Sequence, residues 1–156
     1  MRLQLQIDQR SRALLQKLRK IVRDFAGNPP VLAAAFRDCG VVCLNDLRVR
    51  FLQNSAGGGE WKPLAPSTLK KKTPRRGILR VTDRLYESLR PKNPDNILRV
   101  TRGGVSYGSK TPYGKYHQDS RRRSLPRRKF LLPPSPDAKA RCKAVLTKAV
   151  KQILEQ

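Results

Sequence analysis

Apolar side chains recur every three to four residues from 30 to 53, and this stripe constrains the fold more than any other feature. A helix with such a stripe must bury it against other parts of the chain. Asn28 can cap this helix, and Pro29 and Pro30 suit a first turn, where no backbone N–H is needed. The sequence therefore predicts a long helix over 30–53. The stripe comprises Leu32, Ala35, Phe36, Cys39, Val42, Cys43, Leu47 and Phe51.

Two other stretches have helical spacing. Ser11 can cap a helix over 12–26, and Gly27 with Asn28 provides its end. The two prolines that follow predict a helical hairpin between 12–26 and 30–53. Ser135, Pro136 and Asp137 are typical of a helix start and predict a last helix. The apolar residues of these two helices are Leu14, Leu18, Ile21, Val22 and Phe25, then Ala138, Cys142, Val145, Leu146, Ala149, Val150 and Ile153.

Short extended segments add a small sheet. Residues 3–7 alternate apolar and polar side chains, which predicts a strand, or an arm that joins a neighbour's sheet. Residues 97–100 and 105–107 flank two glycines, Gly103 and Gly104, that suit a hairpin turn because glycine accepts positive φ. Brief helices are predicted at 66–72 and at 82–89, the latter capped by Thr82. We expect an α+β fold: a helical hairpin and a C-terminal helix on a small antiparallel sheet.

Charge is the second constraint. The 156 residues suit a single domain over 1–156, yet 35 Lys and Arg oppose only 11 Asp and Glu, a net charge of +24. Most of this excess lies in 61–136, where twenty bases meet four acids. Two long basic loops are predicted, at 54–80 and at 109–136, and they cover much of this basic region. Such a chain favours a polyanion or an acidic protein as partner, and its fold is expected to depend on partners.

The basic loops supply the candidate contacts to DNA or to an acidic partner. Each candidate lies in or beside a run of like charge between 70 and 127. A charge run is often only a solvated face, but the excess here favours a polyanion contact. The candidates are Lys70, Lys71, Lys72, Arg75, Arg76, Arg121, Arg122, Arg123 and Arg127.

Catalytic groupings are scarce. Glu60 and Lys62 have the acid-x-Lys spacing of metal-dependent nucleases, and Asp46 would have to supply the second carboxylate for Mg²⁺. Asp46 lies in a predicted helix, whereas such nucleases use adjoining strands, so an ordinary loop is preferred. Residues 57–59 are three glycines without the lysine of a phosphate loop, and we read them as a flexible tip. His117, the single histidine, is expected to be a hydrogen-bonded packing residue. We therefore expect no enzyme, no metal and no cofactor.

Cysteines and aromatic residues point to packing. Cys39 and Cys43 are four residues apart on one helix face, and together with Cys142 they are expected to be core thiols. A zinc site would need a fourth ligand, and disulfides are not implied. Trp61 is expected to anchor the loop above it. The alternative is a base-stacking platform with Tyr107 and Tyr113, although their spacing is irregular.

No stretch approaches the roughly 20 apolar residues of a membrane span. The first residues also lack the apolar run of a signal peptide. We therefore expect a soluble chain that is intracellular when it is made.

Three segments resemble, in order and spacing, the phage virion morphogenesis family of tail-completion or neck proteins from contractile-tailed phages. The first is Trp61-Lys62-Pro63-Leu64 with Thr68-Leu69 and Lys71, which matches a family pattern Trp-x-Pro-Leu. The second is Ile78-Leu79 with Leu85 and Ser88-Leu89, which matches Ile-Leu before Thr-Gly and Leu-x-x-Ser-Leu. The third is Tyr113 to Gln118 followed by Leu125-Pro126-Arg127-Arg128-Lys129-Phe130-Leu131, which matches Tyr-Ala-x-x-His-Gln and Ile-Pro-x-Arg-Pro-Phe-Leu. Asp83, Gly114 and Lys129 stand where the family has Gly, Ala and Pro.

The resemblance implies a structural protein without catalytic activity. Such proteins form a ring, usually of six copies, between the connector or stopper of the head and the tail tube or sheath, around the channel for the genomic DNA. The implied location is the virion neck or tail, after assembly in the host cytoplasm. The fold and interface residues implied by the likeness are Trp61, Leu64, Leu85, Leu89, His117, Pro126, Arg128 and Phe130.

A basic RNA-binding assembly protein of ribosomal type is the alternative, favoured by size and charge. It would bind RNA tightly as a monomer, whereas a neck protein would form a ring or attach to tails without nucleic acid.

Overall fold

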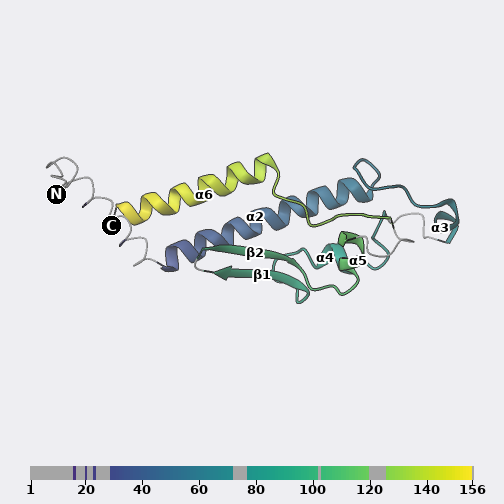
Figure 1. The fold of residues 1–156 in the computed structure, drawn as a ribbon, viewed down its shortest axis with the longest axis horizontal. Coiled ribbons are helices and arrows are strands. Elements are labelled where there is room, and N and C mark those ends of the chain that lie inside the picture. The colour runs from purple at the N-terminus through teal and green to yellow at the C-terminus, as the bar shows by residue number, and fades with distance from the viewer. Residues whose placement is uncertain are drawn as a thin grey trace, which may run out of the picture.

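The computed structural model describes residues 16, 20, 23, 29–71, 77–101, 103–119 and 126–155. Within them, five helices accompany one two-stranded antiparallel sheet (Figure 1). In chain order these are α2 (Pro29–Ser55), α3 (Pro66–Lys71), α4 (Arg84–Glu87), β1 (Asn96–Thr101), β2 (Gly104–Ser109), α5 (Gly114–Asp119) and α6 (Pro136–Leu154). The predicted α+β class is confirmed.

Helix α2 is the central element. It matches the helix predicted at 30–53 and lies between α6 and the β1–β2 hairpin, both of which it contacts (Figure 1). The stripe residues Cys39, Cys43, Leu47 and Phe51 are buried as predicted. Leu44, outside that stripe, is fully buried as well. Leu44 lies with the stripe residues Leu47 and Phe51 in one buried cluster, so the buried face of α2 is wider than the predicted stripe.

The hairpin approaches α2 closely at Gly40. A Cβ built at Gly40 would lie 2.8 Å from Cγ2 of Val105 and closer still to Leu98. Because both neighbours are side chains of the paired strands, glycine lets the sheet pack against the helix backbone. Gly40 therefore sets the distance between α2 and the sheet.

Helix α6 runs antiparallel to α2 (Figure 1). Its start is the predicted one: Ser135 is the N-cap, and its hydroxyl accepts a hydrogen bond from the N–H of Ala138 at 3.2 Å. Asp46 of α2 accepts from both the backbone N–H (3.2 Å) and the hydroxyl (2.6 Å) of Ser135. The cap thus fixes α6 to α2, and α2 in turn packs on the sheet.

The predicted hairpin is confirmed, with Ile97 opposite Gly108 and Thr101 opposite Gly104. Gly104 therefore belongs to a strand rather than to the turn. The two glycines favoured a turn because glycine accepts positive φ, but Gly104 does not adopt it. The strand or arm predicted at 3–7 lies outside the described residues.

Three short helices complete the chain. The prediction at 66–72 is confirmed by α3. The helix expected at 82–89 is shorter and begins after Asp83 instead of Thr82, because Asp83 adopts a left-handed φ of 56° while its carboxylate pairs with Arg80 (2.7 Å). The segment 109–136 was predicted as loop, which was wrong for α5. Its Gly114 lies against Phe130, where a Cβ would come within 3.0 Å of the ring.

Of the helix predicted at 12–26, the structure describes only Gln16, Lys20 and Arg23, which are helical and exposed. Their spacing places them on the polar face of that predicted helix. The apolar stripe of 12–26 and the corner with 30–53 lie outside the described residues.

Candidate interaction site

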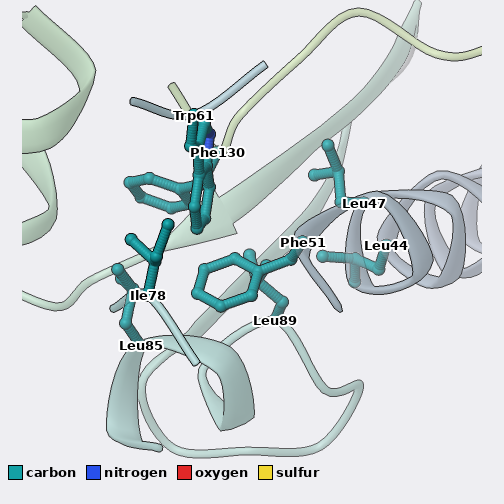
Figure 2. Packing of buried hydrophobic residues seen from close by; sticks show 8 residues of the cluster. All are labelled: Leu44, Leu47, Phe51, Trp61, Ile78, Leu85, Leu89 and Phe130. Carbon is teal, nitrogen blue, oxygen red and sulfur yellow. The ribbon is translucent and has the colours of Figure 1, made fainter. Parts of the chain in front are cut away.

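Eight buried side chains form one aromatic core at the C-terminal end of α2. Figure 2 shows Leu44, Leu47 and Phe51 reaching from α2 toward side chains of later segments. Phe51 is central: its ring lies 5.0 Å from Trp61 at 85° and 6.4 Å from Phe130 at 74°, both edge-to-face arrangements that aromatic rings favour. The aromatic core consists of Leu44, Leu47, Phe51, Trp61, Ile78, Leu85, Leu89 and Phe130.

The residues that carry the family resemblance meet in this core. Trp61 comes from the first segment, Leu85 and Leu89 from the second, and Phe130 from the third; Leu64 packs against them. Segments separated by up to about seventy positions are thus neighbours in space. Trp61, Leu85, Leu89 and Phe130 are buried and Leu64 is partly buried, so these residues contribute to packing within the chain.

Trp61 and Arg128 connect the first and third segments through polar contacts. The indole Nε1 of Trp61 donates to the carbonyl of Lys129 at 2.8 Å. The guanidinium of Arg128 donates to the carbonyl of Lys62 through Nη2 (3.0 Å) and Nε (3.3 Å), and to Pro63 (3.4 Å). The expected anchor role of Trp61 is confirmed. Its alternative, a base-stacking platform, is wrong for Trp61 because the ring is only 6% exposed.

Arg128 is a buried cation: it is 6% exposed and forms no ion pair within the described residues. Burial lowers the pKa of its guanidinium, because the charged form loses hydration. Carbonyl dipoles replace that hydration here. Replacing Arg128 would therefore remove the guanidinium donors from the carbonyls of Lys62 and Pro63.

Gln118 also holds the third segment in place, and it was not named as a candidate from the sequence. Its Oε1 accepts from the backbone N–H groups of Phe130 (3.2 Å) and Leu131 (3.1 Å), and its Nε2 donates to the carbonyl of Leu131 (2.8 Å). The Gln118 side chain thus hydrogen-bonds to the backbone of residues 130–131 much as a neighbouring β-strand would. Its place after His117 in the third motif was the available signal.

His117, expected to be a hydrogen-bonded packing residue, is partly buried beside Arg128. Its backbone carbonyl accepts from the N–H of Arg128 at 3.1 Å, but its ring Nδ1 is buried without a hydrogen-bond partner among the described residues. Burial, and then the charge of Arg128, lower the pKa of His117. Burial and the neighbouring guanidinium therefore both favour the neutral form of the His117 ring.

The structure describes three of the candidate basic contacts, and all are exposed: Lys70, Lys71 and Arg127. The first two lie on α3, which buries no residue, and its Leu69 is 58% exposed. Figure 1 places α3 at one end of the molecule, away from α6 and the sheet. The other candidates, Lys72, Arg75, Arg76, Arg121, Arg122 and Arg123, lie outside the described residues.

Asp46, the second carboxylate that a metal-dependent nuclease would need, is already hydrogen-bonded to Ser135. Burial by itself would raise the pKa of Asp46, but hydrogen bonds from Ser135 and the neighbouring Arg50 lower it overall. This carboxylate is therefore committed to the start of α6, whereas Glu60 is exposed. Across the described residues, no three His, Cys, Asp or Glu side chains are grouped so as to hold a metal ion.

Comparison of the chain with protein-family models, curated proteins and solved structures finds no match. In the part of the chain that the structure describes, no helix has the length and apolar character needed to cross a membrane.

Proposed function

We propose that this protein is a structural subunit of a phage neck, a tail-completion protein that forms a ring, of six copies by the resemblance, between the head connector or stopper and the tail. The convergence of three separated motif segments in the aromatic core carries the proposal. A chance likeness of short motifs would have no reason to place Trp61, Leu85 and Phe130 in contact with one core. The packing of residues from all three segments in one core is what a fold shared with that family would require.

Asp83 gives independent support. It stands where the family has glycine, and its φ of 56° is in the left-handed region that glycine adopts at least cost. The backbone at this position therefore has the conformation that the family's residue would favour. Its ion pair with Arg80 helps to hold a non-glycine residue there.

Helix α3 supports an assembly role. A helix of six residues is not stable by itself in water, and α3 buries none of its residues against the rest of the described chain. Its exposed Leu69 and two lysines suit contact with a neighbouring subunit or an acidic tail protein. We propose that α3 becomes buried when the ring forms or docks.

The high positive charge also limits how much of the ring's surface can contact the DNA. Six copies at +24 each would surround a polyanion, and each neutralised phosphate would strengthen attachment by counterion release. A channel that passes the genome must not hold it tightly. We therefore propose that much of the basic surface meets acidic protein and that the rest contacts the DNA end in the filled particle, without catalysis.

Two binding measurements on the full-length protein test the proposal against the RNA-binding alternative. Native mass spectrometry without nucleic acid should show a closed ring, or purified tails should capture the protein. The proposal fails if the protein stays monomeric, ignores tails and instead binds RNA with a strong salt dependence.

A further inference from the structure

Three cysteines from distant parts of the chain meet between α2 and α6. The Sγ atoms of Cys43 and Cys142 are 3.9 Å apart. The thiol of Cys39 lies 3.7 Å from the carbonyl of Cys142, and the thiol of Cys142 lies 3.7 Å from the carbonyl of Cys39. Every cysteine of the chain is therefore in this cluster, and all three are free thiols. This thiol cluster is separate from the aromatic core and from α3.

We propose that Cys43 and Cys142 are a dithiol site that a small disulfide, such as oxidised glutathione, converts into an intramolecular disulfide joining α2 to α6. A disulfide requires two sulfur atoms about 2.05 Å apart with Cβ atoms about 3.5–4.5 Å apart. The two Sγ atoms, now 3.9 Å apart, lie on helices that are already packed together and would have to approach by about 1.9 Å to bond. This inference is independent of the proposed neck role.

Exposure determines the order of the two steps. Cys39 and Cys43 are each 5% exposed, whereas Cys142 is only partly buried. Cys142 therefore meets the oxidant first: its thiolate attacks one sulfur of oxidised glutathione, forms a mixed disulfide and releases one glutathione. The Cys43 thiolate then attacks Sγ of Cys142 and releases the second glutathione. The protein loses two electrons and two protons, which reduce one oxidised glutathione to two thiols.

The environment makes this conversion slow rather than impossible. Burial raises the pKa of Cys43 and of Cys142, so few thiolates exist near neutral pH. Reducing glutathione in a cytoplasm would keep the pair as thiols. The site would oxidise only after the protein passes into a more oxidising medium.

The disulfide would close a loop between residues 43 and 142. Closing a loop of about 100 residues restricts the unfolded chain strongly, so the oxidised protein should unfold at a higher temperature. We expect a rise in Tm of about 5 °C or more for a chain of this size. The cross-link would hold α6 on α2 even where the cap at Ser135 frays.

The test treats the reduced full-length protein with oxidised glutathione and measures the intact mass, then blocks the remaining thiols with N-ethylmaleimide under denaturing conditions and maps peptides by mass spectrometry. The proposal predicts a protein lighter by two hydrogens, a Cys43–Cys142 peptide pair and one blocked thiol at Cys39. Cys39→Ala is the matched control, since it removes a buried thiol on the same helix face and should leave the cross-link intact. Cys43→Ala and Cys142→Ala should each abolish it.

Four results would overturn the proposal: a stable glutathione adduct on Cys142, a Cys39–Cys142 pair, disulfides between chains, or no oxidation of the folded protein. The mapping on the unsubstituted protein decides the matter even if a variant does not fold. The same sample, scanned with and without reductant, gives the predicted shift in Tm.

Discussion

Replacing Arg128 by alanine tests whether a buried cation holds the motif segments together. The change removes three contacts, two to the carbonyl of Lys62 and one to that of Pro63. Hydrogen bonds from a charged group contribute about 1.5–3 kcal/mol each, but the hydration that the buried guanidinium has lost offsets much of this. We expect a net loss of about 2–3 kcal/mol in the free energy of unfolding, which lowers Tm by about 4–12 °C.

Arg127 provides the matched control, because it is the exposed neighbour of the same residue type. Arg127→Ala should change the free energy of unfolding by less than about 0.5 kcal/mol. Urea denaturation followed by circular dichroism measures both variants. Equal losses at the two positions would refute the argument, since they would show that burial and carbonyl contacts do not distinguish Arg128.

A second readout comes from His117. Burial contributes most to its lowered pKa, and the charge of Arg128 contributes the remainder. Arg128→Met should therefore raise the pKa of His117 part of the way toward its usual value, measured by NMR titration of the imidazole. An unchanged pKa would show that the two side chains are not coupled.

The remaining predictions concern the core, the cap of α6 and the exposed helix. Phe51→Ala should cost about 3–5 kcal/mol because it removes the ring at the centre of the aromatic core, whereas Leu52→Ala, at a 37% exposed position, should cost below about 1 kcal/mol in the same urea titration. The pKa of Asp46 is lowered in the folded state, so its carboxylate stabilises the fold above the unfolded pKa near 4, and this stabilisation is lost as the pH falls through the folded value. Asp46→Asn should therefore reduce the dependence of the free energy of unfolding on pH in the acid range. Leu69→Asp should leave Tm unchanged but reduce ring formation or capture by tails, with Thr68→Asp as the control of equal charge.

Each of these three predictions would be contradicted by a specific result. Similar losses for Phe51→Ala and Leu52→Ala would contradict the orientation of α2. An acid limb that keeps its slope without the Asp46 carboxylate would assign acid unfolding to other groups. A lower Tm for Leu69→Asp would show that α3 packs within its own chain.

Local signals in the sequence were enough for the long helices and the hairpin. The apolar stripe over 30–53, the cap at Ser135 and the two strands joined at 102–103 each depend on residues that are close together in the sequence. Neighbouring side chains are therefore enough to specify each of them. The features that were missed depend on contacts across the chain. The buried face of α2 is wider than the predicted stripe and includes Gly40 and Leu44, because the strands and later segments of the chain pack against it.

The same distinction applies to the candidate site. Burial of Trp61 and Phe130 could be expected from their motifs, but the donors that join them could not. The resemblance implied a fold or interface role for Arg128, but its place in a run of bases is typical of solvated surface, and its contacts with the carbonyls of Lys62 and Pro63 follow only from the fold. Gln118 was equally hidden, because its partners are backbone groups twelve and thirteen positions away. Sequence patterns identify side chains that avoid water more readily than those that satisfy distant backbone atoms.

Electron microscopy of virus particles assembled without this protein tests the central claim most directly. The account predicts filled heads and finished tails that remain separate, and joining that is restored when the purified protein is added. Normal, infectious virions with heads attached to tails in its absence would contradict the proposed role in the neck.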